Sequence, residues 1–443
     1  MIKDANGINK NPDAETPFWW LAAPPEVDNG EVPPDNCDVA IVGSGYTGIT
    51  AALYLAAAGR KVVVLDREAV GFGASTRNGG IASGNIRLGV EQAKQQFGVD
   101  KARKFFGEGV AARDHLRELI TTHNIDCDYQ LNGRFTGALT EKDLQNMSRE
   151  VEQFSELTGI EAYSVEKNQL SQYIGSDIYV GGVIRTDIAH FHPGKLHRGL
   201  LTVAREKGAC VIGYCGVEQI DKQDTGAGFR LQTARGQLLA DEVIMATNGY
   251  NQKSLDSWLT KRIVAVRSRI IVTESVSKNL ISTLSPNLRA MGENRKLFRY
   301  FRPGPDGDRM IFGSREPLLN TNLEKAIEHV RRGMVGVFPD LADAQVESSW
   351  AGNVAFSRSE LPLLFQHDGI HYAMGYCGSG TVWAPWFGKQ LAEKIITKDQ
   401  QAQQQSLFFS EPPAAIPLYN GRPWFIPAAM AWEGIQDRLQ GRH

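Results

Sequence analysis

The sequence predicts a chain of mixed α/β and α+β class, with a Rossmann-like domain built on a parallel sheet and a second, discontinuous domain. Two observations predict this class. Residues 37–66 indicate a strand, a glycine turn, a helix and a second strand, which is the repeating unit of a parallel sheet. Residues 262–274 alternate apolar and polar side chains, as a half-buried strand does. This strand lies outside the segments assigned to the parallel unit, so a second domain with strands of its own is expected.

The first unit has the spacing of a Rossmann-like dinucleotide-binding turn. Residues 39–42 are a short apolar run, typical of a strand buried on both faces. Gly43 permits the tight turn, Gly45 leaves room for a pyrophosphate, and Gly48 lets the next helix pack closely. Asp66 ends the second strand, where a carboxylate accepts hydrogen bonds from a ribose 2′-OH. The helix N-terminus offers free N–H groups to phosphates.

Length, charge and cysteine content narrow the kinds of protein that this chain could be. A length of 443 residues favours two or three domains, and the net charge of −2 without a basic block gives little support for nucleic-acid binding. Five widely spaced cysteines without a CxxC pair favour a reduced cytoplasmic compartment and predict no metal site. The N-terminus lacks a signal segment, and no run reaches the ~18 apolar residues of a membrane span.

The remaining elements follow from periodicity and turn signals. Further helices are expected over residues 91–123, 142–158, 194–207, 322–338 and 381–394. Further strands are expected within residues 128–139, 180–184 and 241–247, and a hairpin over 296–313. Pro193 suits the first turn of its helix, because its missing N–H has no partner there.

The order of these elements predicts a discontinuous division. The nucleotide-binding domain comprises residues 37–90, 180–250 and 345–398, and the second domain comprises 91–179 and 251–344. Residues 1–36 form an N-terminal arm with an aromatic knot at 18–20, and residues 399–443 form a C-terminal tail. The knot either packs on the domain or contributes to a substrate entrance or subunit contact.

Four segments together resemble one known family. They are the turn at 43–48 with Asp66, the loop GFGASTRNGG at 71–80, AHFHP at 189–193, and GYCGSGT at 375–381. Over roughly residues 36–400 the chain resembles the FAD-dependent D-amino-acid oxidase/glycine oxidase superfamily, and within it the gamma-glutamylputrescine oxidase-type amine oxidases. The resemblance implies an FAD-binding domain and a substrate domain whose antiparallel sheet covers the flavin.

The resemblance, with the chemistry of the turns, assigns residues to the cofactor. Backbone amides of residues 375–381, which precede a helix, would face the pyrimidine end of the flavin together with the helix dipole, where positive potential stabilises the reduced flavin. Arg77 either neutralises phosphate or holds Asn78. Non-covalent FAD is expected, with Cys377 as the alternative point of attachment. The expected cofactor-binding residues are Gly43, Gly45, Tyr46, Thr47, Gly48, Asp66, Arg67, Gly73, Ala74, Ser75, Arg77, Asn78, Gly79, Gly80, Val217, Thr247, Gly249, Gly375, Gly378, Gly380 and Thr381.

The family chemistry implied for the substrate is oxidation of a C–N bond. Hydride passes from the α-carbon of an amine to flavin N5, the imine is hydrolysed, and electrons pass to O₂ to give H₂O₂. The candidate residues are Tyr300, Arg302, His192 and Asn353. Arg302 is either a bidentate clamp for a carboxylate or a solvated hairpin arginine. His192, before a helix-initial proline, is more often a cap than a base.

One position departs from the family pattern. Relatives that act on simple α-amino acids carry an arginine where this chain has Val354. This departure favours an amine, an N-substituted amine or a larger acid as substrate. Arg358 is the nearby arginine that could compensate.

Three other functions stay open from the sequence. The enzyme could pass electrons to a quinone or another acceptor, as a dehydrogenase does. The chain could be the flavin subunit of a larger complex, through the aromatic and proline-rich segment 416–427. That tail could instead pack on its own chain or attach to a membrane surface. A plain NAD-dependent dehydrogenase is weaker, because it has no place for the loop at 73–81.

Overall fold

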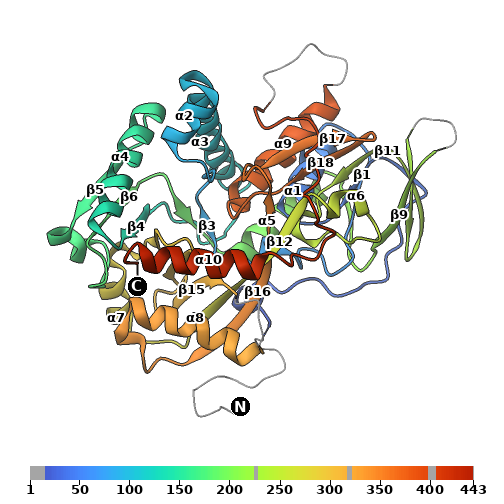
Figure 1. Ribbon diagram of the computed structural model, residues 1–443. Helices are drawn as coiled ribbons and strands as arrows, with labels where there is room; N and C mark the ends of the chain where they lie inside the picture. Colours follow the sequence, from blue (N-terminus) through green and yellow to red (C-terminus); the bar gives the residue numbers. More distant parts are fainter. Residues whose placement is uncertain (1–14, 224–227, 317–321, 398–405, 443) are drawn as a thin grey trace.

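Two eight-stranded sheets organise the chain, and they lie side by side in Figure 1. The computed structural model describes residues 15–223, 228–316, 322–397 and 406–442. One sheet is largely parallel and the other largely antiparallel, so the predicted fold class is confirmed.

The first sheet carries the dinucleotide-binding unit. Its central pairs β1–β11, β1–β2 and β2–β8 are parallel. Its order is β17 (Leu363–His367), β18 (Ile370–Met374), β11 (Gly236–Met245), β1 (Asn36–Val42), β2 (Val62–Leu65) and β8 (Cys210–Ile212), with β10 (Phe229–Thr233) on β11 and β9 (Val217–Lys222) on β10. The apolar runs of β1 and β2 are buried, as expected for strands covered on both faces.

The second sheet is antiparallel except for the β4–β13 pair. Its order is β16 (Val346–Ser357), β12 (Ile263–Thr273), β15 (Met310–Arg315), β14 (Arg299–Pro303), β13 (Ala290–Glu293), β4 (Arg134–Ala138), β6 (Gly181–Arg185) and β5 (Ala162–Glu166). The predicted hairpin is present as β14 and β15, which pair from Arg299 with Ser314 to Pro303 with Met310. A short pair, β3 (Ile81–Ala82) and β7 (Ala189–His190), forms a third sheet.

Helices cover both sheets. The helix α1 (Tyr46–Ala57) packs on α5 (Pro193–Glu206) and α9 (Gly380–Ile396), and their apolar side chains form the largest buried cluster. The other helices are α2 (Val90–Phe97), α3 (Val99–Thr122), α4 (Glu141–Thr158), α6 (Ser257–Thr260), α7 (Lys278–Leu284), α8 (Leu323–Val337) and α10 (Ile426–Leu439). Short 3₁₀ turns lie at η1 (Phe18–Trp20), η2 (Ala74–Thr76), η3 (Lys167–Gln172), η4 (Asn248–Tyr250), η5 (Pro286–Leu288) and η6 (Pro339–Leu341).

Two features differ from the expected elements. The single helix expected over 91–123 is two helices, because Gly98 adopts φ +80° between them. The strands β6 and β16 belong to the second sheet, although their segments were assigned to the nucleotide-binding domain. Apolar periodicity identifies a strand but not its partner. We therefore propose that the domain boundary follows the two sheets, with β6 and β16 in the second domain.

The ends of the chain pack on its body. Of the predicted arm, residues 1–14 lie outside the described ranges, and Trp19 is fully buried. In the tail, Asp437 of α10 accepts the Lys296 and Leu297 N–H groups, and Glu433 pairs with Arg315. Packing on its own chain is therefore part of the tail's role, while Trp432 stays 57% exposed.

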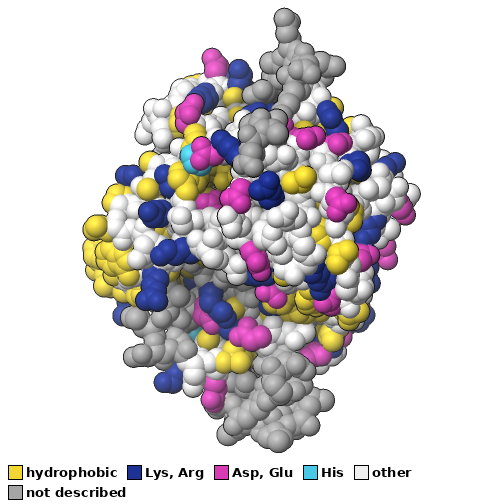
Figure 2. All heavy atoms as spheres, turned by 90° about the vertical axis from the view of Figure 1, so that its right-hand side faces the viewer, with side chains coloured by type: hydrophobic (Ala, Val, Ile, Leu, Met, Phe, Trp, Pro, Cys, Tyr) yellow, Lys and Arg dark blue, Asp and Glu magenta, His cyan; other side chains and the backbone are white. Residues whose placement is uncertain are grey.

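Surface charge is evenly mixed on the face that Figure 2 shows. Lys and Arg side chains alternate there with Asp and Glu side chains rather than gathering into one area of a single sign. Among the described helices, none has the length and apolar character needed to cross a membrane.

Candidate active site

A cavity lies where the strands β1, β2 and β11 of the parallel sheet end. Ligands bind at this edge in doubly wound sheets. The cavity brings together most residues expected to bind the cofactor: Gly43, Gly45, Tyr46, Thr47, Asp66, Arg67, Gly73, Ala74, Ser75, Asn78, Val217, Thr247, Gly378, Gly380 and Thr381. Gly48, Arg77, Gly79, Gly80, Gly249 and Gly375 do not belong to its described lining.

The glycines of the turn are required by their backbone surroundings. A Cβ on Gly48 would lie 2.0 Å from the Gly43 carbonyl oxygen, so α1 starts against the turn itself. Gly43 has φ +106°, and its Cβ would lie 2.9 Å from the Ala246 carbonyl oxygen. The neighbour that Gly45 accommodates is the Ser75 hydroxyl, 2.9 Å from its ideal Cβ.

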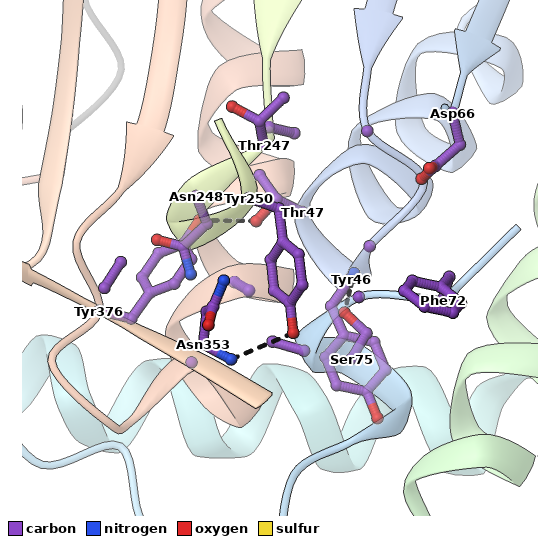
Figure 3. Close-up of a pocket in the computed structure, with 18 of the residues that line it drawn as sticks. Tyr46, Thr47, Asp66, Phe72, Ser75, Thr247, Asn248, Tyr250, Asn353 and Tyr376 are labelled. Atoms are coloured by element: carbon purple, nitrogen blue, oxygen red, sulfur yellow. Dashed lines mark hydrogen bonds between the residues drawn. The ribbon is translucent and has the colours of Figure 1, made fainter. Parts of the chain in front are cut away.

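The loop at 73–80 is tied to the start of α1. The Ser75 hydroxyl accepts the Tyr46 N–H (2.8 Å), which is one of the N–H groups that a helix leaves free (Figure 3). Asn78 donates to the Ala74 and Ser75 carbonyls and accepts the Gly80 N–H, which closes the loop on itself. These bonds hold the cavity wall in place without a ligand.

Arg77 and the aromatic knot support this loop from behind. The Arg77 guanidinium lies over the Trp20 and Phe72 rings and donates to the Phe72 carbonyl (2.9 Å). The indole N–H of Trp19 donates to the Asn78 carbonyl, and that of Trp20 donates to the Thr76 hydroxyl, both at 2.9 Å. The knot thus packs on the loop, and Arg77 links the arm to the loop through its contacts with Trp20 and Phe72.

Asp66 lies at one end of the cavity, apart from Asn353 and Tyr376 in Figure 3. Its carboxylate accepts the Ser44 N–H (2.8 Å), the Ser44 hydroxyl (2.6 Å) and the Glu68 N–H (3.1 Å). Burial raises the pKa of Asp66, while these hydrogen bonds oppose the rise. The side chain is oriented by its own turn, at the position expected to meet a ribose.

The opposite end of the cavity is formed by η4, β16 and the start of α9. The Thr47 and Tyr376 hydroxyls lie 2.6 Å apart, and the Tyr250 hydroxyl accepts the Asn353 N–H (3.1 Å) (Figure 3). Asn353 also donates from Nδ2 to the Gly249 carbonyl (3.0 Å). Gly249 is therefore connected to the cavity indirectly, because its carbonyl oxygen accepts a hydrogen bond from Asn353, which lines the cavity.

The cavity suits a dinucleotide. Among the described residues, the buried Thr247 hydroxyl has no hydrogen-bond partner, although it belongs to the lining. Such a group needs a partner from a ligand or water. Gly378 has φ +100° and open space where its Cβ would be, next to the N-terminus of α9. A backbone-lined space at a helix N-terminus fits a negatively charged or electron-accepting ring.

A second cavity adjoins the first and is covered by the antiparallel sheet. The two share Ala74, Asn78, Asn353, Val354, Cys377, Gly378 and Thr381. From β14, Tyr300 lines the second cavity, and its ring lies 2.8 Å from the ideal Cβ of Gly79. Burial raises the pKa of Tyr300 to about 12, so its hydroxyl stays protonated beside Ser268 (3.2 Å).

Arg302 and His192 lie outside the described lining of both cavities. Arg302 is 1% exposed and donates to Nδ1 of His190 (2.5 Å). His192 is the N-cap of α5 and accepts the Lys195 N–H at Nδ1 (3.1 Å), which is the capping role weighed from the sequence. Burial lowers the pKa of His192 to about 4. Of the four candidate substrate residues, the cavity unites Tyr300 and Asn353.

Val354 and Cys377 lie at the boundary between the cavities. Val354 brings no charge to this boundary, and Arg358 lines a different surface hollow. The Cys377 thiol donates to the Gly375 carbonyl (3.1 Å), and burial raises its pKa. A protonated, hydrogen-bonded thiol is a weak nucleophile.

Several site residues were not identified from the sequence. Ser75 was expected at the cofactor, but its capping bond to α1 depends on a loop 29 residues away. Tyr250 carries no motif signal of its own, and Tyr376 lies within the expected segment 375–381 but was not singled out there. Arg134, which lines the second cavity from β4, lies in a segment expected only to be a strand.

A dinucleotide cavity that opens into a second cavity under an antiparallel sheet defines a class of flavin-type oxidoreductase. The family model described as FAD dependent oxidoreductase matches residues 38–394. The chain therefore belongs to the FAD-dependent oxidoreductase family, and its cofactor is FAD.

Individual relatives agree with this assignment. The chain is 31% identical to "Probable oxidoreductase OrdL" of Haemophilus influenzae over 83% of this chain and 84% of that protein. It is 30% identical to gamma-glutamylputrescine oxidoreductase of Escherichia coli K12, over 91% and 93% of the two chains. The solved glycine oxidase of Geobacillus kaustophilus shares the fold, with a TM-score of 0.69, 19% identity, and coverage of 83% and 96%.

Proposed function

We propose that the protein oxidises a C–N bond in an amine or N-substituted amino acid and passes the electrons to O₂, giving H₂O₂. When bound, FAD supplies the two-electron acceptor for this chemistry. The observation that supports the proposal is the pair of adjoining cavities, which places a substrate space against the residues at the α9 end of the cofactor cavity.

The chain's own residues favour the reactive form of an amine. Arg77 and Arg134 line the second cavity without an ion pair to a described carboxylate, and none of its described lining residues is Asp or Glu. Positive charge nearby disfavours an ammonium ion, so a substrate amine is held with its lone pair free. No side chain is then needed as a strong base.

The uncharged boundary favours substrates other than simple α-amino acids. A free α-carboxylate beside the oxidised carbon would lie near Val354, which offers it no partner. The relatives include a gamma-glutamylputrescine oxidoreductase, whose substrate is an amine, and this similarity supports the same choice.

The test is anaerobic loss of flavin absorbance in the purified holoprotein. The panel comprises primary amines, N-methyl amino acids and free α-amino acids. We expect bleaching by an amine or an N-substituted amino acid. Bleaching by free α-amino acids alone would contradict the proposed substrate class.

The acceptor is tested on the same reduced protein. Admission of air is expected to restore the yellow colour and to release one H₂O₂ for each amine consumed. Slow recovery in air with rapid reduction of a quinone would instead identify a dehydrogenase.

A further inference from the structure

One wall of the second cavity carries an arginine without an acidic partner. Arg134 of β4 forms no ion pair with a carboxylate in the described ranges, and its buried Nε has no hydrogen-bond partner there. The nearby acids serve other arginines: Glu293 pairs with Arg295 (2.8 Å), and Asp187 pairs with Arg185 (2.7 Å). Arg134 is half-buried, and a partly desolvated cation without an anionic partner gains more from an anionic ligand than a fully solvated one does.

The surrounding strands hold Arg134 in this position. Gly292 of the neighbouring strand β13, which pairs with Thr136, lies against the Arg134 guanidinium, and an ideal Cβ on Gly292 would lie 2.3 Å from it. The Phe298 ring lies 5.3 Å from the guanidinium carbon. Burial lowers the pKa of Arg134 to about 10, which leaves it charged at neutral pH. The arginine is thus a half-buried positive group on the wall of the cavity, with the Phe298 ring beside it.

Two aromatic rings separate this charge from the cofactor cavity. Phe298 stacks on Tyr300 with ring centres 5.9 Å apart, and Tyr300 contacts Gly79 of the loop that closes the cofactor cavity. Lys296 lines the same wall, and Asp437 of α10 holds its backbone. Along this wall, the Arg134 guanidinium is therefore followed by the Phe298 and Tyr300 rings and then by the loop at 73–80.

We propose that Arg134 binds a carboxylate of the substrate that is remote from the oxidised C–N bond. This inference rests on the proposed function and narrows its substrate class to amines with an anionic group at the far end of an apolar spacer. The uncharged Val354 at the boundary of the two cavities and the arginine beyond the two rings are complementary: beside Val354 a carboxylate meets an apolar side chain, whereas at Arg134 it meets a guanidinium that has no acidic partner among the described residues. Charge-assisted bonds of guanidinium to carboxylate are strong and directional.

The first test is binding without turnover. Calorimetry on the holoprotein compares pentanoate with pentanamide, which has the same size but no charge. We expect the wild type to bind pentanoate about tenfold or more tightly than pentanamide, and R134Q to lose this difference. The control variant R103Q carries the same Arg→Gln substitution at an exposed position on α3. It should bind pentanoate and pentanamide with the wild-type affinities. R134K separates charge from geometry and should keep part of the preference.

The second test compares 5-aminopentanoate with pentylamine as substrates. In the wild type the carboxylate-bearing member should have a KM about tenfold to a hundredfold lower, and R134Q should raise that KM with a smaller change in kcat. Equal KM values in the wild type, or a preference that survives R134Q, would overturn the subsite. If Arg134-dependent pentanoate binding is found but no amine bleaches the flavin, the subsite stands and the proposed function fails. Flavin content and thermal melting show whether R134Q is folded.

Discussion

The two adjoining cavities are built from different parts of the chain. The cofactor cavity is formed chiefly by backbone: Gly43, Gly45 and Gly378 leave main-chain atoms against the ligand space. The substrate cavity is formed chiefly by long side chains, among them Arg134 and Tyr300. A backbone-lined site tolerates no added atoms, whereas a side-chain-lined site can change its specificity one residue at a time. The predictions below test how far this contrast holds.

The largest effect is expected at Gly48. In G48A the new methyl group meets the Gly43 carbonyl oxygen at 2.0 Å, so α1 must move away from the turn. We expect loss of flavin binding and destabilisation of about 3 kcal/mol or more. Flavin content and denaturant unfolding measure both.

The matched control for Gly48 is Gly336, which also lies in a helix. Nothing lies within 4 Å of its ideal Cβ. G336A should keep its flavin and gain roughly 0.4–1 kcal/mol, since alanine favours the helix and restricts the unfolded chain. Equal behaviour of the two variants would refute the steric account.

The free energy of unfolding should depend on pH because of His190, which lies beside Arg302 of β14 in the antiparallel sheet. His190 accepts a hydrogen bond from Arg302 at Nδ1 and meets the Leu288 carbonyl at Nε2 (2.9 Å), so it must be neutral. Burial and the neighbouring Arg302 lower its pKa to about 3. Below pH 6.5 the unfolded chain takes up a proton that the folded chain refuses. Stability is therefore lost as pH falls, by about 2 kcal/mol at pH 5 from this group.

The measurement is denaturant unfolding between pH 7 and 5, in the wild type and in H190Q. The variant lacks the titrating ring, so its stability should fall less steeply with acid. Parallel slopes in the two proteins would show that His190 is not held neutral in the folded state.

Ser75 tests whether the cofactor cavity also depends on a side chain. S75A removes the acceptor for the Tyr46 N–H and should cost about 1 kcal/mol, as loss of a helix cap does. Flavin affinity should fall severalfold, because the loop at 73–80 loses its tie to α1. S75T, which keeps the hydroxyl, should restore part of the affinity. A fully unchanged S75A would mean that the backbone alone sets this wall.

The smallest effect is expected at Cys377. Its thiol is protonated and bonded to the Gly375 carbonyl, which favours non-covalent FAD. After unfolding in urea, ultrafiltration should separate all flavin from both the wild type and C377S. Flavin that stays with the wild-type chain but not with C377S would identify a covalent bond at this cysteine.

The same contrast explains what could be predicted from the sequence. The glycine turn is recognisable because its positions leave no room for a side chain, and Asp66 and the loop at 71–80 are recognisable because their polar side chains hydrogen-bond nearby backbone groups. The fold class followed from them and from the alternation in β12. The substrate wall has no such signature: an arginine in a strand, such as Arg134, has the same local pattern whether it meets solvent or a cavity. Tyr300 was identified through its hairpin, whereas Arg302, two residues on, is buried against His190.

The pairing partners of the strands could not be predicted from the sequence either. Whether β6 and β16 join one sheet or the other depends on contacts with segments far along the chain, such as β12 with β16. Local periodicity contains no information on that choice.

The contact of α10 with the β13–β14 connection has a consequence for the order of assembly. During synthesis the ribosome completes every described segment that lines the cofactor cavity before it reaches Asp437, which holds the backbone at Lys296 and Leu297. A nascent chain thus has its flavin cavity complete in sequence while the substrate wall still lacks its outer brace. Each newly made chain can therefore bind FAD before its substrate cavity has reached its final structure.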